Sequence, residues 1–160
     1  KGRVQVWRQL KKTGAISYRG LWVIPFNKER IPLLEELAAL VLSLEGESLV
    51  FEGKLLNDAD EGRVLDNLGE ASRLEYTELL DKCADYLKEI EKETAAENFI
   101  FAEVEENEEE LEKLKNWFKK IQKRQIVEIP EKEQAITAIA KCEEVFEQFS
   151  AVAYERADKA

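Results

Sequence analysis

The chain has 160 residues, of which 44% are hydrophobic and 36% are charged. This length fits one compact domain, or a small domain with a helical extension, and the apolar fraction is sufficient for a buried core. The sequence has no histidine, which excludes a histidine general base, and no apolar run of about 18 residues, which excludes a membrane-spanning helix.

The formal net charge of -10 is distributed unevenly along the chain. Residues 1–30 hold eight lysines and arginines against one acid, residues 31–110 hold six against twenty-four, and residues 111–160 hold ten against nine. The net negative charge argues against non-specific binding of nucleic acids or membranes by the whole surface. It is compatible with a local basic site at the front of the chain.

Residues 3–13 predict a short amphipathic helix that ends at Gly14. The apolar face of this helix comprises Val6, Trp7 and Leu10. Arg8 and Lys12 are four residues apart and fall on the opposite face, with Lys11 near its edge.

Residues 15–19 and 21–26 predict a β-hairpin with its turn near Arg19 and Gly20. Pro25 closes the second strand, because proline cannot donate a ladder hydrogen bond. The front of the chain therefore predicts a helix followed by two antiparallel strands.

A second helix is predicted over residues 28–45, with Asn27 as its N-cap and Gly46 as its end. Its apolar face has the width expected of a helix that lies on a sheet and comprises Leu33, Leu34, Leu37, Leu40, Val41 and Leu44. Residues 48–51 then predict a short strand bounded by Gly53.

Residues 1–56 thus form a predicted α+β subdomain with the order helix, strand, strand, helix, strand. This is the ferredoxin-like βαββαβ order without its first strand. A sheet that lacks an interior strand exposes unpaired edges, so we expect another element, for example one from a neighbouring chain, to fill the gap.

Helical spacing begins with a capping-box-like start at residues 58–61 and continues to about Glu93, although the pattern is compatible with a break near Gly69. Four residues of this helix form a coiled-coil-like seam with steps of four, three and four: Leu79, Cys83, Tyr86 and Ile90. The two cysteines, Cys83 and Cys142, have no metal-binding spacing, so we expect both to be buried in a protein of the reducing cytoplasm.

Two further helices are predicted over residues 106–124 and 131–157. The segment before the first of them could be briefly extended and pack Phe99 and Phe101 into the core. Residues 57–160 therefore predict an antiparallel bundle of about three helices, and the fold class of the whole chain is α+β, mostly α overall.

Cations at the front of the chain are the first candidate site. Contacts with phosphates need mobile cations on an exposed face, and the candidates are Arg3, Arg8, Lys11, Lys12 and Arg19. The alternatives are an ordinary solvated face or pairing with the acidic middle of the same protein.

A second basic ridge lies in residues 113–124, opposite the apolar face of that helix. Lys120 and Arg124 are its candidate phosphate contacts. The polar face of a bundle helix explains the same pattern and is the favoured interpretation.

The acidic run at residues 103–110 lacks the spacing of an EF-hand loop, and the preference of carboxylates for the first turn of a helix explains it. The sequence contains no glycine-rich phosphate loop, nucleophile elbow or HExxH motif. We therefore expect no metal site, no cofactor and no enzymatic activity.

Three ordered segments, residues 3–25, 73–93 and 98–124, together resemble the N-terminal domain of ChrB, the chromate-resistance regulatory protein. The resemblance covers nearly the whole chain. It implies a cytoplasmic, chromate-responsive transcriptional regulator that contacts DNA and controls a chromate-efflux gene. The front half is also similar to the ferredoxin-like domain of PaaX-type repressors and of CRISPR-associated nucleases.

Members of this family typically begin with a hydrophobic strand ahead of the basic segment, in agreement with the missing first strand. The matching positions in this sequence are Arg3, Trp7, Arg8, Lys11, Lys12, Arg73, Glu75, Tyr76, Trp117 and Arg124. Among these, Trp7 and Tyr76 are expected to pack internally, and Arg73 and Glu75 could be internal salt-bridge partners.

The resemblance also implies a separate C-terminal chromate-resistance domain as a partner, a homo-oligomer as an alternative, and no membrane association. A chromate anion could be held by arginine and lysine cations in the manner of phosphate. A different interpretation is a protein-interaction module without DNA contact, in which the bundle and an open sheet edge mediate dimerisation or docking. A nuclease or a chromate reductase is disfavoured, because histidine is absent and the cysteines are unpaired.

Overall fold

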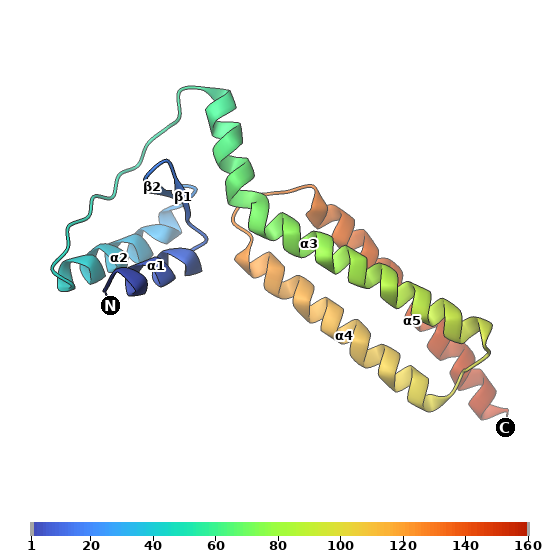
Figure 1. Cartoon of the computed structure of the whole chain (residues 1–160). Coiled ribbons are helices and arrows are strands. Elements are labelled where there is room, and N and C mark those ends of the chain that lie inside the picture. The colour runs from blue at the N-terminus through green and yellow to red at the C-terminus, as the bar shows by residue number, and fades with distance from the viewer. Residues whose placement is uncertain (1, 160) are drawn as a thin grey trace. The chain divides into compact units, whose positions relative to one another are not determined.

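The structure of the protein is a computed structural model that describes residues 2–159, and the chain is 74% helical. The chain divides into two compact units (Figure 1). The first runs to Glu70 and also includes Gln125–Val127, and the second comprises Ala71–Arg124 and the chain from Glu128 onwards. The mostly helical fold class is confirmed, while the predicted domain boundary between residues 56 and 57 stays a prediction.

The first unit begins with α1 (Gly2–Lys12), which packs against α2 (Ile31–Ser43). A Cβ atom on Gly2 would lie 3.2 Å from a methyl group of Leu44, so the helices approach each other closely at this end. Val6 and Leu10 are half-buried on the inward face of α1. Trp7 was expected on that face, but its side chain is largely exposed, so this prediction is wrong.

A hairpin follows α1 and consists of β1 (Ile16–Tyr18) and β2 (Leu21–Val23). The strands are antiparallel, and Ser17 lies opposite Trp22. The turn has φ values of 49° at Arg19 and 85° at Gly20, which is the left-handed backbone that a two-residue type I′ turn requires. The predicted hairpin and its turn are confirmed, with shorter strands than expected.

The predicted second helix is divided into the short 3-10 helix η1 (Lys28–Arg30) and α2. Asn27 caps it as predicted, because its Oδ1 accepts a hydrogen bond of 2.9 Å from the backbone N–H of Glu29. The left-handed residue after α2 is Glu45, with φ 61°, and the N–H of Gly46 donates to the carbonyl of Val41 at 3.0 Å. The helix therefore ends at Ser43, two residues earlier than predicted.

The strand predicted over residues 48–51 is wrong, because the structure gives this segment no regular secondary structure. Leu49 is 94% exposed and Phe51 is 72% exposed. A strand needs a neighbour for its backbone donors and acceptors, and within the described residues the sheet contains β1 and β2 alone. The ferredoxin-like order is therefore not confirmed.

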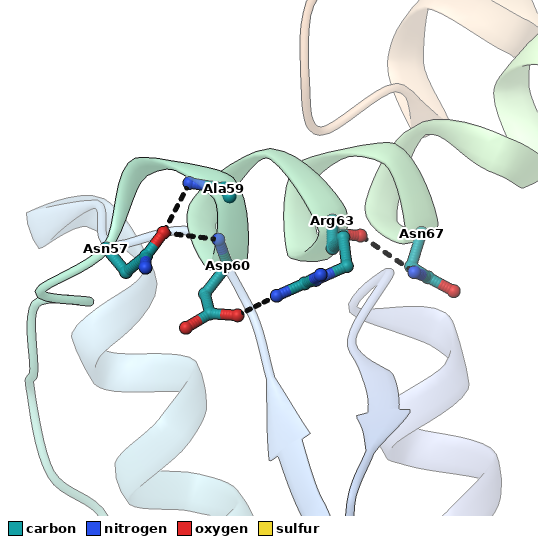
Figure 2. A network of polar contacts seen from close by, with 5 residues as sticks. All are labelled: Asn57, Ala59, Asp60, Arg63 and Asn67. Atoms are coloured by element: carbon teal, nitrogen blue, oxygen red, sulfur yellow. Dashed lines mark hydrogen bonds and ion pairs between the residues drawn. The ribbon is translucent and has the colours of Figure 1, made fainter.

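The helix α3 (Asp58–Ala95) begins with a polar network in the first unit (Figure 2). Asn57 is its N-cap, since the Asn57 Oδ1 accepts hydrogen bonds from the backbone N–H groups of Ala59 at 2.8 Å and Asp60 at 3.4 Å. One turn later, Asp60 forms an ion pair with Arg63, and the Asn67 Nδ2 donates to the Arg63 carbonyl at 2.7 Å. The cap lies one residue before the predicted start.

Replacing Asn57 by alanine is expected to lower the free energy of unfolding by about 1 kcal/mol, because two N–H groups of the first helical turn lose their acceptor. Chemical denaturation followed by circular dichroism measures this change. Asn57→Asp is the matched control, since aspartate supplies an equivalent acceptor, and it should stay within about 0.5 kcal/mol of the original. Equal losses for both variants would contradict this capping role.

The second unit is a bundle of the later part of α3, α4 (Phe101–Arg124) and α5 (Glu131–Asp158), with successive helices antiparallel (Figure 1). The predicted seam is confirmed, because all four of its residues are buried: Leu79, Cys83, Tyr86 and Ile90. Burial raises the pKa of the Tyr86 phenol, whose hydroxyl donates to the Asn107 carbonyl on α4 at 3.2 Å. The Cys142 thiol on α5 donates to the Cys83 carbonyl at 3.7 Å, so polar contacts join α3 to both neighbours.

Two details of the helices differ from the sequence prediction, and a third, the continuity of α3, was left open by the sequence. No break occurs in α3 near Gly69, and α4 begins at Phe101 rather than at residue 106. Phe99 packs against Phe149 with a ring-centroid distance of 5.1 Å, as expected, but Phe101 is exposed. Because Phe101 is already the first helical residue, its side chain follows the helical spacing instead of the alternation of an extended segment.

Candidate nucleic-acid interface

Five cations of the first unit make up the front basic surface: Arg3, Arg8, Lys11, Lys12 and Arg19. The first four lie on α1, the fifth lies in the hairpin turn, and all five are exposed. In the part of this unit that the structure describes, none of them forms an ion pair with an acidic residue. Their charges are therefore not neutralised by ion pairs within the described part of the unit, and α1 and the hairpin turn present a cluster of cations to the solvent.

The cations on α1 form two rows along the helix. Arg3, Trp7 and Lys11 occupy positions i, i+4 and i+8, so their side chains follow one another along one row. Arg8 and Lys12 form a second row, again with a spacing of four residues. Lys11 belongs to the row of the tryptophan rather than to the row of the other two cations.

Aromatic rings lie beside two of these cations. The Lys11 Nζ is 5.9 Å from the ring centroid of Trp7 and 6.0 Å from that of Trp22. The Arg19 guanidinium is 5.9 Å from the ring centroid of Tyr18. These distances are within the range of cation–π contacts, which orient the cations without removing their charge.

The candidate contacts of the second basic ridge, Lys120 and Arg124, lie on α4 in the second unit. Lys120 is exposed, whereas Arg124 forms an ion pair with Glu75 on α3. Arg73 pairs with Glu131 at 3.5 Å, so the expectation that Arg73 and Glu75 have salt-bridge partners is confirmed. These pairs support the favoured interpretation of the ridge as the polar face of a bundle helix.

The acidic run and the cysteines do not form a metal site in residues 2–159: no group of three or more Cys, Asp and Glu side chains is placed to hold an ion there. The run extends from the first turn of α4 well into the helix, and of its carboxylates the first turn holds Glu103, so the helix-dipole explanation applies to that residue and not to the run as a whole. Cys83 and Cys142 are both buried, as predicted. Contact with Cys83 and burial raise the pKa of the Cys142 thiol, which disfavours its thiolate.

Trp22 was not among the site residues predicted from the sequence, and Trp7 was predicted to pack internally although it is exposed. Trp22 lies opposite Ser17 in the hairpin, and a polar partner on a two-stranded sheet is a signal that this face is solvated. Trp7 lies four residues from a cation on each side, at Arg3 and Lys11, which is the spacing of a basic row. Both signals were present in the sequence.

The fold and this surface define a two-part protein, with a basic, aromatic helix-and-hairpin unit and a three-helix bundle. None of the helices in the described chain is both long enough and apolar enough to cross a membrane.

The family model described as "Protein ChrB, N-terminal" matches residues 3–160, and the chain therefore belongs to this family. The resemblance seen in the sequence is confirmed, and the family is that of a regulatory protein associated with chromate resistance. Neither a curated protein nor a solved structure matches the chain.

Proposed function

We propose that this chain is a DNA-contacting module of a chromate-resistance regulator, and that the front basic surface binds the phosphate backbone. The observation that carries the proposal is a set of five exposed cations on α1 and the hairpin turn without an ion pair in the described part of their unit. A phosphate backbone would supply the missing anions and would release bound counterions.

The arrangement of α1 supports this proposal. Arg8 and Lys12 are one helical turn apart on the same side of α1, so both side chains can contact phosphates of the same DNA strand. Lys11 and Arg3 extend the cationic area along the neighbouring row. Contacts of this kind position a protein on DNA and give little sequence discrimination, so the operator sequence would have to be read by other groups.

A binding titration tests the proposal. The probe is a labelled duplex that covers the region upstream of the gene for this chain, and fluorescence anisotropy is measured at two salt concentrations. If four of the five cations contact phosphates, the affinity should fall by about 100-fold between roughly 50 and 200 mM salt. No binding at either concentration would overturn the proposal.

The wider regulatory setting is part of the same proposal. The module acts in the cytoplasm without enzymatic activity, and a separate C-terminal chromate-resistance domain supplies the response to chromate. The cations of the front basic surface are also the groups that could hold a chromate anion directly, since chromate resembles sulfate and phosphate in shape and charge.

A second candidate function is self-association, and the exposed apolar segment at residues 47–56 favours it. Its large side chains are unusually accessible, as the values for Leu49 and Phe51 show, and exposed apolar groups of this kind mark interaction sites. The segment includes Val50 and Phe51, two residues of types that favour strands, and in the described residues each strand of the β1–β2 sheet has an open edge. The occupant of such an edge would be the corresponding segment of a second copy.

Light scattering at high protein concentration tests this candidate. The unchanged chain is expected to form a dimer, and Leu49→Asp combined with Phe51→Asp should shift it to a monomer, because a charged strand face opposes pairing. The matched control is Leu42→Asp combined with Tyr154→Asp, two exposed positions outside the segment, which should leave the dimer intact. A strict monomer before any substitution would contradict the candidate.

A further inference from the structure

Two exposed tryptophans flank one lysine on the front basic surface. We propose that Trp7, Lys11 and Trp22 form a stacking surface for the unpaired bases of single-stranded DNA, with the neighbouring cations holding its phosphates. The inference rests on the proposed function, since it assumes that the front basic surface contacts nucleic acid. It goes beyond that function, because phosphate contacts to a duplex need no aromatic ring.

The geometry places the two rings on one accessible surface. Trp7 is 51% exposed on α1, and Trp22 is 37% exposed on β2. One ammonium group, the Lys11 Nζ, lies within about 6 Å of both ring centroids. Two elements of the first unit therefore present their tryptophans around the same cation.

The hydrophobic core of the first unit does not use the two tryptophan rings. The inward face of α1 is formed by Val6 and Leu10, and the opposite face of the hairpin carries Ile16 and Val23, which are half-buried. Tryptophan is ordinarily well buried in folded proteins, so two rings left open on one surface cost hydrophobic free energy. A ligand that covers both rings would recover it.

The combination of rings and cations selects the class of ligand. Each unpaired base has a flat face that stacks on an aromatic side chain, and each nucleotide carries a phosphate for a neighbouring cation such as Arg3 or Arg8. In an intact duplex the bases are already stacked on one another, so the rings would remain uncovered. An acidic protein surface would satisfy the cations but offers no regular series of flat faces.

Tryptophan emission gives a direct test. The starting protein carries Trp117→Phe, which removes the tryptophan of the bundle and leaves emission from Trp7 and Trp22 alone. A fifteen-nucleotide thymidine oligomer should quench this emission on binding, since stacked bases quench indole fluorescence. The same length of duplex should bind with little quenching.

Substitutions test the role of each ring. Trp7→Leu and Trp22→Leu should each weaken binding of the oligomer by at least about fivefold, whereas the corresponding phenylalanine variants should retain most of the affinity, because a stacking face remains. Duplex binding should change by less than about twofold in all four variants. Circular dichroism shows whether each variant is folded. The quenching experiment leaves both rings in place, so it tests the inference even if a variant fails to fold.

The outcomes separate this inference from the proposed function. Binding of the oligomer without quenching, or with equal affinity in the leucine variants, overturns the stacking surface even if duplex binding depends on Arg8 and Lys12. Absence of binding to either form of DNA overturns both. Capture of an acidic protein partner that quenches the same emission, together with no oligomer binding, also contradicts the inference.

Discussion

Replacing Arg8 and Lys12 together by glutamate is expected to lower the affinity for duplex DNA by about 100-fold at low salt. Each charge-assisted contact to a phosphate contributes about 1.5 kcal/mol, and the two introduced carboxylates also repel the backbone. Both side chains are exposed and lack an ion pair in the described part of their unit, so their replacement should leave the fold unchanged. Anisotropy titration with the upstream duplex measures the effect.

The matched control replaces Lys82 and Lys88 by glutamate. These lysines lie on α3, are also exposed, and give the same change in net charge. We expect the control to lose less than about threefold in affinity, because only its long-range electrostatic contribution changes. Equal losses in the two double variants would show that net charge, rather than the front basic surface, controls binding.

The second large effect concerns the core of the bundle. Leu79→Ala is expected to reduce the free energy of unfolding by about 2–5 kcal/mol, since Leu79 is 0% exposed and the truncated side chain leaves a cavity between the helices. Leu74→Ala on the same helix is the control, because Leu74 is 62% exposed and its truncation should cost less than about 0.5 kcal/mol.

Urea denaturation followed by circular dichroism compares these two variants. Both substitutions remove the same atoms from the same helix, so the difference between them reports burial alone. A loss of similar size at the two positions would contradict the orientation of α3 in the bundle. A large loss only at Leu79 would support the seam that joins α3 to α4 and α5.

The helical part of the fold was predictable because its pattern is local. The steps of four, three and four between Leu79 and Ile90 put these residues on one side of a helix. That side is expected to be buried whichever segments of the chain supply the neighbouring helices. The hairpin turn was predictable for a similar reason, since Arg19 and Gly20 need only each other and the adjoining strands.

The absence of a strand at residues 48–51 was not predictable from the same kind of evidence. The composition of this segment favours a strand, but a strand forms only where another strand supplies hydrogen-bonding partners. The sequence pattern cannot show whether such a partner is present. The capping of α3 by Asn57 rather than Asp58 is a smaller example, because adjacent polar residues compete for the same free N–H groups.

The candidate site was predicted in part. Charge counting located the cations of α1 and the hairpin turn, and the structure shows them exposed. The ion pair of Arg124 could be found only from the fold, since its partner Glu75 is 49 residues away in the sequence. The exposure of Trp7 was missed because a tryptophan beside apolar residues was assigned to the core by residue type.

The salt dependence of duplex binding tests the central proposal most directly. The equilibrium constant is measured for the original chain and for Arg8→Ala combined with Lys12→Ala over a series of salt concentrations. If both side chains neutralise phosphates, the slope of log K against log salt should become less steep by about two in the double variant. An unchanged slope, or no binding of the original chain at the lowest salt, would contradict the proposal that these residues contact DNA.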